Sequence, residues 1–350
     1  MKALVTGGAG FIGSHLALRL LEGGHQAVVV DDLSAGRVDH LDRALERYGF
    51  LLRIVDLLDA DALSDCFTGV DWVFHLAGYG DAREARRRPK RALEAHVQAT
   101  LQVLECARHF RAKAFVYAAS ATCYGLDAPV PTPEIAPTSP CDPLAITKHL
   151  GEQLVLDWSR LYDLPAMSLR LFDVYGARAP LTPRWGPVAS VFLAQRASGA
   201  PLTVAGDGAQ TRDFVHVDDV TRAMILAAQQ PQPGEVFNIG SGVGTSITRL
   251  AELVGGPWVS VPARPGDVRQ RTADVRRAHE RLDWRAEIDI EEGIQRLLHD
   301  LDAWRNAPVW TPEFVTELHQ GAPAPATTTP PSPSPDPAVI PPPASPAPPA

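Results

Sequence analysis

The sequence predicts an α/β protein built on a doubly wound parallel sheet, with a smaller C-terminal α/β cap. Two observations predict this fold class. Short apolar runs alternate with longer amphipathic stretches through the first 170 residues, which is the pattern of a parallel sheet covered by helices on both faces. A glycine-rich turn also follows the first apolar run directly, as expected where a strand passes into a helix.

Hydrophobic periodicity divides the first part of the chain into strands and helices. The near-continuous apolar runs predict six strands, at Lys2–Thr6, Ala27–Asp31, Leu51–Val55, Trp72–Leu76, Ala114–Ala119 and Ala166–Arg170. The amphipathic stretches between them predict helices around Ile12–Glu22, Ala60–Phe67, Lys90–Phe110 and Leu144–Tyr162. Because helices separate successive strands, the strands are expected to run parallel.

The later part of the chain is less regular and predicts the cap. Its shorter strands and helices are expected at Leu202–Ala205 and Val236–Ile239, and around Val188–Ala197, Val217–Gln229, Ser246–Val254 and Ile290–Leu301. We therefore expect a first domain over residues 1–170, to which later segments return, and a cap mainly over 171–310. Residues 322–350 are almost entirely Pro, Ala, Ser and Thr, which predicts a disordered tail.

Charge and cysteine content argue against several classes of protein. The 350 residues carry a formal net charge of −8, whereas a binder of duplex nucleic acid needs a cationic face. The six cations between Arg83 and Arg91 predict only a solvated entry to the next helix. The four cysteines include no Cys-x-x-Cys pair, so we expect neither a metal site nor a disulfide framework. With no signal peptide or membrane span predicted, we expect a cytoplasmic protein without nucleic-acid or membrane partners.

The strongest local motif is the turn after the first strand, Thr6-Gly7-Gly8-Ala9-Gly10-Phe11-Ile12-Gly13. Its glycines permit a tight turn, close approach of a pyrophosphate to the backbone, and packing of the helix on the strand. The start of the helix would offer unpaired N–H groups and a partial positive charge to phosphates. We therefore expect an adenine dinucleotide on the backbone of Gly7, Gly10, Phe11, Ile12 and Gly13.

The end of the second strand bears on which dinucleotide binds. Asp31 stands about 20 residues beyond the glycines, where a Rossmann-type fold places the carboxylate that binds the adenosine ribose. Asp31 and Asp32 would together repel a 2′-phosphate, whereas Arg37 could attract one. The sequence therefore favours NAD as the cofactor and leaves NADP open.

Further motifs extend the pattern along the chain. They are Asp31-Asp32-Leu33-Ser34-Ala35-Gly36, Val55-Asp56-Leu57, His75-Leu76-Ala77-Gly78, Ser120-Ala121-Thr122-Cys123-Tyr124-Gly125, Leu171-Phe172-Asp173-Val174-Tyr175-Gly176, Gln210-Thr211-Arg212-Asp213-Phe214 and Arg264-Pro265-Gly266-Asp267-Val268. With them the chain from Lys2 to about Leu301 resembles the extended short-chain dehydrogenase/reductases that act on nucleotide sugars, especially the UDP-glucose 4-epimerase-like members. The resemblance implies an NAD-dependent Rossmann-fold enzyme that epimerises a nucleotide-diphosphate sugar.

The resemblance also implies roles for individual residues at the cofactor. Asp56 would bind the adenine amino group, with Leu57 beside the ring. Leu76 and Ala77 would line the cofactor after the fourth strand. His75 is expected to pack at the end of that strand rather than to bind a metal, because no set of His, Asp or Glu partners accompanies it.

For the substrate and the partner subunit, the resemblance implies a second set of contacts. Arg212 and Arg264 would hold the diphosphate, for which bidentate guanidinium groups are well suited. Asp173, in the same site, stands where the family has asparagine. The helices predicted at Lys90–Phe110 and Leu144–Tyr162 would form a homodimer contact across a two-fold axis.

The catalytic group is where the sequence departs from the family. Family members use a Ser/Thr and a Tyr-x-x-x-Lys pair, in which the lysine binds the nicotinamide ribose and lowers the phenol pKa. The phenolate then takes the hydroxyl proton of the sugar. Ser120, Thr122 and Lys148 match this set, but Leu144 stands at the tyrosine position and no tyrosine lies between Leu126 and Arg160. A leucine cannot transfer a proton.

The missing phenol leaves the reaction open. A positioned acid or base contributes about 10²–10⁴-fold, so its loss predicts a slow enzyme more readily than an inactive one. His96 also replaces a family asparagine, and the candidate replacements by residue type are Thr122, His96, Cys123, Tyr79, Tyr124 and Tyr175. Three hypotheses remain, namely an epimerase with an atypical proton relay, a pseudoenzyme that binds NAD and a nucleotide sugar, and a dehydratase, decarboxylase or reductase of the same family. The Cys-Tyr pair after Thr122 argues against dehydration, because dehydratase-like members carry an acidic pair there.

Overall fold

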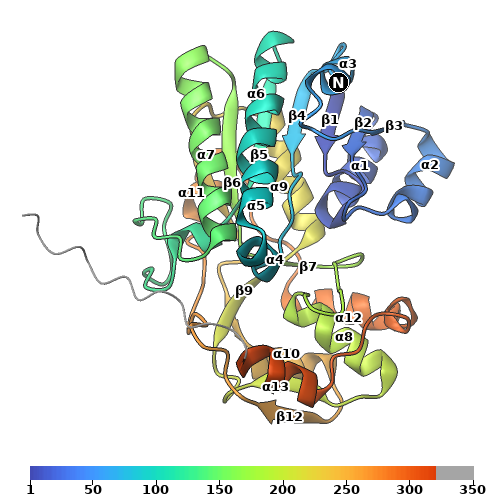
Figure 1. Cartoon of the computed structure of the whole chain (residues 1–350), viewed down its shortest axis with the longest axis vertical. Helices are drawn as coiled ribbons and strands as arrows, with labels where there is room; N and C mark the ends of the chain where they lie inside the picture. Colours follow the sequence, from blue (N-terminus) through green and yellow to red (C-terminus); the bar gives the residue numbers. More distant parts are fainter. Residues whose placement is uncertain (321–350) are drawn as a thin grey trace, which may run out of the picture.

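The structure is a computed structural model that describes residues 1–320, apart from the side chains of Arg43 and Leu45; the tail predicted at 322–350 lies outside the described residues. A seven-stranded parallel sheet with helices on both faces forms its larger part. A smaller assembly of helices and short strands lies beyond the end to which the strands of this sheet point (Figure 1). The α/β fold class and the doubly wound parallel sheet are confirmed.

The order of strands in the main sheet is β3-β2-β1-β4-β5-β6-β10, and every neighbouring pair is parallel. The order reverses between β1 and β4, and ligands of doubly wound sheets bind beyond the carboxyl ends of the strands at such a point. The strands are β1 (Lys2–Thr6), β2 (Gln26–Asp31), β3 (Leu51–Ile54), β4 (Trp72–His75), β5 (Ala114–Ser120), β6 (Ala166–Leu171) and β10 (Val236–Ile239).

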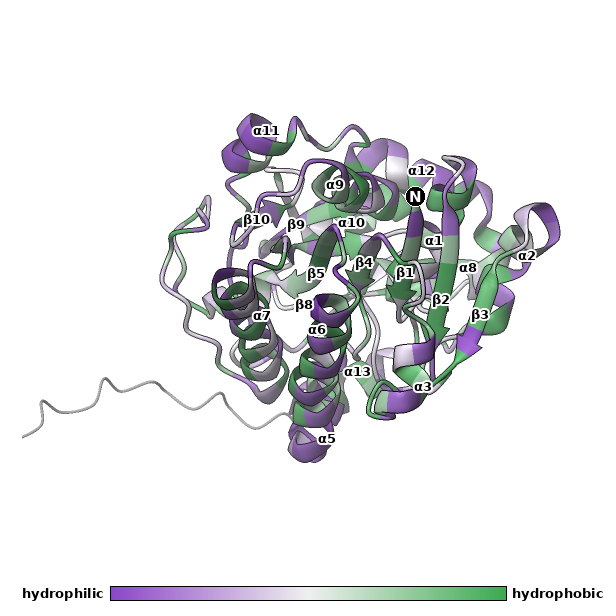
Figure 2. Ribbon diagram, turned by 90° about the horizontal axis from the view of Figure 1, so that it is seen from above, coloured by the Kyte–Doolittle hydropathy of each residue, from purple (hydrophilic) through white to green (hydrophobic). Residues whose placement is uncertain are grey.

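Each face of the main sheet carries its own layer of helices (Figure 2). Leu16 and Met224 lie in the first core, beneath α1 (Phe11–Glu22), α9 (Val217–Gln229) and α11 (Arg276–Leu282). Val103 and Val155 lie in the second core, beneath α3 (Ala60–Asp65), α6 (Ala99–His109) and α7 (Pro143–Tyr162). Burial on both faces explains why the strands of this sheet are apolar throughout instead of alternating.

The smaller assembly has a separate core. Phe192, Leu250 and Ile294 lie at its centre, and Trp310 and Val315 extend it past residue 310, where the sequence predicts the cap to end. Two small sheets contribute, β11-β9-β7 and β12-β8. The elements are β7 (Asp173–Tyr175), β8 (Leu202–Ala205), β9 (Thr211–His216), β11 (Gly244–Ser246), β12 (Trp258–Val261), α8 (Val188–Ser198), α10 (Ile247–Val254), α12 (Ile290–His299), the 3₁₀ turn η4 (Leu301–Trp304) and α13 (Pro312–Gln320).

Several short elements differ from the sequence prediction. The helix predicted at Lys90–Phe110 consists of α5 (Pro89–Leu93), a π-helical turn at Glu94–Gln98, and α6. The basic stretch from Arg83 forms most of α4 (Ala82–Arg87) in addition to the start of α5. The sequence pattern did not predict β7, β9, β11, β12, α2 (Asp42–Tyr48), α4, α11, α13 and the 3₁₀ turn η1 (Val38–Leu41), most of which are too short to show a clear period. None of the helices within residues 1–320 combines the length and apolar character that a bilayer crossing requires.

Candidate active site

The glycine turn between β1 and α1 packs directly against the segment that follows β4. Gly7 has a φ of +66°, and a Cβ on it would lie 2.9 Å from both N and Cα of Ala77. A Cβ on Gly13 would overlap the carbonyl oxygen of Gly7. Gly7 and Gly13 are therefore required by the backbone packing, and they keep this side of the turn free of side chains.

The amino end of α1 offers main-chain donors at this turn. Gly10 is the N-cap and supplies no side-chain cap, and Ser14 donates the first intrahelical N–H bond, to Gly10 O at 3.1 Å. The N–H groups of Phe11, Ile12 and Gly13 precede that bond and point out of the helix end, where the helix dipole favours an anion. This donor set fits the pyrophosphate of a dinucleotide.

Asp31 lies beside the glycine turn, at the end of β2. Its side chain accepts hydrogen bonds at 2.9 Å from the main-chain N–H groups of Ala9 and Leu33, and burial raises its pKa. Arg37, which could have attracted a 2′-phosphate, instead forms an exposed ion pair with Asp39, at 2.5 Å between Nη2 and Oδ2. The charge of Arg37 is therefore compensated, and the carboxylates of Asp31 and Asp32 would repel a 2′-phosphate.

The other residues predicted to bind the cofactor surround the same edge of the sheet. Val55 donates its main-chain N–H to Asp31 O at 3.2 Å, which brings the end of β3 beside the end of β2. Next in the chain, Asp56 is exposed and Leu57 is buried. Leu76 and Ala77 follow β4 directly and are partly buried. The predicted cofactor residues that follow β1, β2, β3 and β4 therefore lie at one edge of the sheet.

A buried hydrogen-bonded chain through His75 fixes the segment after β4. Thr6 Oγ1 lies 3.2 Å from the main-chain nitrogens of Leu76 and Ala77 and 2.7 Å from His75 Nδ1. Because Thr6 accepts from those two N–H groups, its hydroxyl proton points to Nδ1, and His75 Nε2 donates to Thr100 Oγ1 at 2.9 Å. Burial, followed by the charge of Lys148, lowers the pKa of His75 to about 3. His75 is a neutral structural residue, as expected from the sequence.

Lys148 projects from α7 towards the ends of β4 and β5. Its ammonium group donates to Ala118 O at 3.2 Å and lies 5.5 Å from the centre of the Tyr117 ring. Burial alone lowers the pKa of Lys148 to about 8. Close by, after β5, Thr122 Oγ1 donates to Ser120 Oγ at 2.9 Å within the 3₁₀ turn η3 (Ala121–Tyr124).

His96 lies next to Lys148 in the π-helical turn and is buried, with 1% of its surface exposed. Its Nδ1 is 2.8 Å from Thr147 Oγ1, whereas its Nε2 makes no hydrogen bond within the described residues. From the position that a Cβ on Gly78 would take, His96 Nε2 lies at 2.7 Å and Lys148 Nζ at 3.6 Å. Burial, then the charge of Lys148, lowers the pKa of His96 to about 3, against a smaller opposing effect of the Tyr79 backbone.

Leu144 stands one helical turn before Lys148 and is partly buried, so no phenol occupies the position beside the lysine. Most of the residues considered as replacements have other partners or an unsuitable pKa. Tyr124 Oη donates to Asn238 at 2.7 Å, and Tyr175 Oη donates to Asp289 O at 3.2 Å. Burial raises the pKa of the Cys123 thiol to about 12.

On the cap side, the predicted substrate residues do not all have free side chains. Arg212 is buried on β9 and forms an ion pair with Asp267 at 2.5 Å, besides donating to Val268 O at 2.7 Å. Arg264 is exposed after β12. Asp173 begins β7, and its Oδ2 is buried and unpaired within the described residues.

Arg83 is a cation that the sequence analysis assigned to a solvated stretch. It is partly buried, and its Nη1 donates to Arg184 O at 2.6 Å, in the loop that follows β7. Burial and then the charge of Arg264 lower the pKa of Arg83, which reflects two guanidinium groups close together. Arg83 differs from the other cations of the basic stretch because it contacts residues that are distant in the chain, and the sequence does not reveal such contacts.

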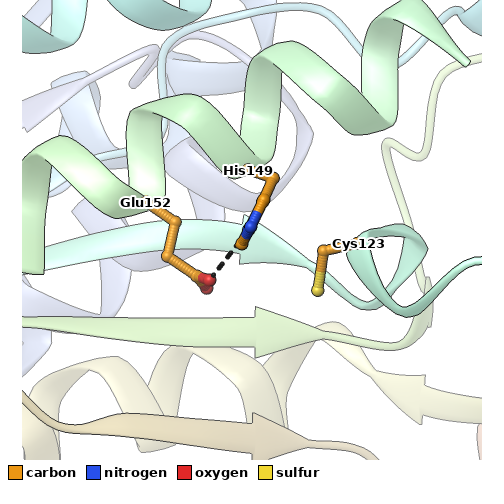
Figure 3. Close-up of side chains that lie close together, drawn as sticks. All are labelled: Cys123, His149 and Glu152. Atoms are coloured by element: carbon orange, nitrogen blue, oxygen red, sulfur yellow. Dashed lines mark ion pairs between the residues drawn. The ribbon is translucent and has the colours of Figure 1, made fainter. Parts of the chain in front are cut away.

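One group of candidate metal ligands occurs within residues 1–320, formed by Cys123, His149 and Glu152 (Figure 3). Their donor atoms lie within 4.8 Å of one another, and Nδ1 of His149 is 3.3 Å from Oε1 of Glu152. Arg170 already binds both oxygens of Glu152, with Nη2 at 2.7 Å from Oε1 and Nε at 3.0 Å from Oε2. Because that guanidinium neutralises the carboxylate and would repel a cation, we assign the group a structural role.

Comparison with known proteins identifies the class to which this fold and site belong. The NAD dependent epimerase/dehydratase family matches residues 3–240, more than half of the chain. The chain therefore belongs to this family, and the family and the cofactor NAD expected from the sequence are confirmed at that level.

Three individual relatives that match most of the chain are UDP-glucose 4-epimerases. A UDP-glucose 4-epimerase of Mycolicibacterium smegmatis is 36% identical over 309 residues, which cover 85% of this chain and 97% of the relative. The crystal structure of the Thermotoga maritima UDP-glucose 4-epimerase with UDP-glucose has a TM-score of 0.79 and 34% identity, over 85% of this chain and 98% of that one. The Thermus thermophilus UDP-glucose 4-epimerase complex with NAD has a TM-score of 0.77 and 29% identity, over 88% and 100%.

Proposed function

We propose that the protein is an NAD-dependent nucleotide-sugar 4-epimerase, similar to UDP-glucose 4-epimerase, in which a group other than tyrosine handles the substrate proton. The observation that carries the proposal is the arrangement of Lys148, Ser120 and the glycine turn around the carboxyl edge of one sheet. The relatives named above that act on UDP-glucose match the chain across this whole region.

The proposed roles at the cofactor follow from the donors and acceptors present. The N–H groups of Phe11, Ile12 and Gly13 would bind the pyrophosphate, and Asp31 would accept from the adenosine ribose. Gly7 and Gly10 would let the phosphates approach, and Asp56, Leu57, Leu76 and Ala77 would enclose the adenine and the nicotinamide half. When bound, NAD would accept a hydride from the sugar carbon and return it.

At the sugar, Ser120 accepts a hydrogen bond from Thr122 and so keeps its own proton for a substrate oxygen. Lys148 would place its side-chain nitrogen beside that oxygen, within reach of the substrate proton. Of the two predicted diphosphate ligands, Arg264 is exposed and has a second guanidinium, Arg83, close by. The charge of Arg212 is already compensated by Asp267. We therefore propose that Arg212 meets the diphosphate as part of this ion pair and not as a free cation.

We also propose a homodimer and a cytoplasmic location. Three apolar residues on the neighbouring helices α5 and α7 have 41–43% of their surface exposed, namely Leu93, Ile146 and Leu150. Their presence on the predicted dimer helices supports a two-fold contact, because such exposed apolar groups mark interfaces.

The four cysteines, all within the described residues, are free thiols, which supports a reducing compartment.

A second candidate function is a pseudoenzyme that binds NAD and a nucleotide sugar without converting it. One observation favours it, the leucine at position 144. The cofactor site keeps its glycine packing and Asp31, so binding would survive the loss of catalysis.

The test uses the purified full chain. Mass spectrometry of the small molecules it releases would identify bound NAD or NADP. The protein would then be incubated with UDP-glucose, UDP-glucuronate and dTDP-glucose separately, and the nucleotide products resolved by chromatography. Lys148→Met is the matched control, because it keeps the length of the side chain and removes the amine.

Conversion of UDP-glucose to UDP-galactose that Lys148→Met abolishes would support the epimerase. A 4-keto-6-deoxy product or a decarboxylated pentose would identify another reaction of the family. Bound NAD with no product from any of the three sugars would favour the pseudoenzyme. A chain that binds no dinucleotide at millimolar concentration would overturn both proposals.

A further inference from the structure

The site contains few polar side chains that could take the place of the missing phenol. Thr122 donates to Ser120, whereas Tyr124 and Tyr175 donate to groups away from Lys148. Tyr79 Oη is buried without a partner in the described part of the chain, but burial raises its pKa. Its ring centre lies 5.2 Å from that of His96, and the charges that act on it are those of Arg91, Glu84, Glu94 and Arg88.

Lys148 differs from these groups because burial lowers its pKa to about 8. The titratable side chains that face it are His75 from β4, His96 from the π-helical turn and Tyr117 from β5. Both imidazoles are neutral, and burial holds the phenol of Tyr117 protonated by raising its pKa. Within residues 1–320 no carboxylate contributes to the pKa of Lys148, which is about 8.

His96 provides the one unsatisfied imidazole nitrogen next to this amine within the described residues. Its Nδ1 is taken by Thr147 Oγ1 at 2.8 Å, which leaves Nε2 directed to the space around Gly78 that Lys148 Nζ also faces. A lone pair on Nε2 would accept a hydrogen bond from the ammonium, whereas an N–H there would oppose it. The tautomer with its proton on Nδ1 therefore suits both neighbours.

We infer that Lys148 is itself the acid and base of the reaction, and that His96 is a positioning residue that accepts a hydrogen bond from its amine. This assignment rests on the proposed function. In this assignment Lys148 transfers the proton that tyrosine transfers in the family. His96, which replaces a family asparagine, then has a function of its own.

The step balances with the groups already named. Lys148 Nζ, as the neutral amine, would take the proton of the sugar hydroxyl, and the carbon of that hydroxyl would give up its hydride to NAD when NAD is bound. A keto sugar and a Lys148 ammonium result. In the return step the Lys148 ammonium would give its proton back to the oxygen as the hydride is restored to the other face of the keto sugar.

The pKa of Lys148 can be measured directly, so this inference can be tested without relying on turnover. The chain has only four lysines, Lys2, Lys90, Lys113 and Lys148. Protein made with ¹³C-labelled lysine therefore gives four side-chain ε signals, and the one missing from Lys148→Arg is Lys148. With saturating NAD, we expect that signal to titrate near 8.

The kinetic test compares this titration with the pH profile of kcat/KM. Below the Lys148 midpoint, kcat/KM should rise about ten-fold for each pH unit, because only the neutral amine is a base. In His96→Leu the loss of the acceptor should lower the NMR midpoint and shift the kinetic profile to lower pH by the same amount. His96→Asn keeps an acceptor oxygen and should restore both.

Coincident shifts of the two midpoints support the inference. Turnover whose pH profile stays fixed while the Lys148 midpoint moves overturns it and leaves the proposed function intact. A Lys148 signal that titrates above 10 also overturns it. Absence of product from every nucleotide sugar refutes the proposed function, and the assignment of Lys148 with it, while the NMR midpoint still reports the state of the amine.

Discussion

Arg170 forms a buried ion pair with Glu152, one helical turn beyond Lys148 on α7, with three nitrogen–oxygen distances of 2.7–3.2 Å between Nε or Nη2 and the two carboxylate oxygens. Ser168 adds a hydrogen bond to Glu152 at 2.9 Å. The pair joins β6 to α7, the helix that carries Lys148. The pair therefore fixes the position of Lys148 and also stabilises the fold.

Removing one partner of this pair should be far more harmful than removing both. Arg170→Met leaves a buried carboxylate without its counter-charge, and we expect it to lower the free energy of unfolding by about 3–5 kcal/mol. The double variant Arg170→Met/Glu152→Met should recover most of that loss, because an apolar pair needs no compensation. Denaturant unfolding of the three proteins measures this. A double variant as unstable as Arg170→Met would show that the pair matters through packing and not through charge.

The same pair predicts how stability depends on acid. Burial raises the pKa of Glu152, but the neighbouring His149 and Arg170 outweigh that effect and hold it at about 2, below the ordinary 4.5. Because the folded pKa is the lower one, the contribution to stability is complete above pH 4.5 and is lost as the pH falls towards 2. Thermal melts between these pH values should show this loss in the wild type and a smaller one in the double variant. Equal losses in both proteins would contradict the assignment.

The glycine packing predicts which substitution destroys cofactor binding. Gly13→Ala places a Cβ against the carbonyl oxygen of Gly7 and must displace the turn, so we expect NAD binding to weaken at least ten-fold. Gly23→Ala, at the other end of α1, is the matched control, since its Cβ would meet its neighbours at 3.4 Å or more. Calorimetric titration with NAD compares the two. Unchanged NAD affinity in a folded Gly13→Ala protein would count against the proposed pyrophosphate site.

The sequence predicted the main sheet well because burial on both faces makes its strands continuous apolar runs. The bounds of β1 matched at both ends, and those of β2, β3, β4, β5 and β6 differed by one residue. Short strands of the cap, such as β7 with three residues, contain too few positions to show a period. Their pairing is decided by neighbours that are distant in the chain, such as Thr211–His216 beside Asp173–Tyr175.

The candidate site was predictable where its chemistry depends on local sequence. The glycine turn and Asp31 lie within one βαβ unit, and their spacing alone indicated a dinucleotide. The state of Arg212 was not predictable, because its partner Asp267 is 55 residues away. The proximity of His96 to Lys148 likewise requires the π-helical turn and α7 to be packed together, which no local pattern encodes.

The exposed apolar face of α7 predicts the effect of a surface charge on assembly. Leu150→Glu places a carboxylate in the proposed two-fold contact, opposite its own copy or near it, so we expect a dimer to dissociate at micromolar concentration. Val243→Glu introduces the same charge at a more exposed apolar residue of the cap and should leave the dimer intact. Sedimentation of both variants provides the readout. A wild-type protein that sediments as a monomer would remove the basis for the proposed contact.

The most informative substitution restores the phenol. Leu144→Tyr places a hydroxyl one helical turn before Lys148, where the amine can lower its pKa, and we expect turnover at pH 7 to rise by about 10²-fold. Leu144→Phe is the matched control, since it adds the same ring without the hydroxyl and should give no gain. The pH profile adds a second readout. In Leu144→Tyr the rise of kcat/KM should no longer follow the NMR midpoint of Lys148, because the phenol has become the base.

Three outcomes of this comparison can be distinguished. A gain confined to Leu144→Tyr means that the site is attenuated by the leucine and still places sugar and cofactor correctly. Equal losses in the Tyr and Phe variants mean that the leucine leaves space that the proton-carrying amine needs, since both variants add a ring next to Lys148. Gains in both variants would contradict proton transfer by the phenol, because the higher turnover would then come from the ring alone.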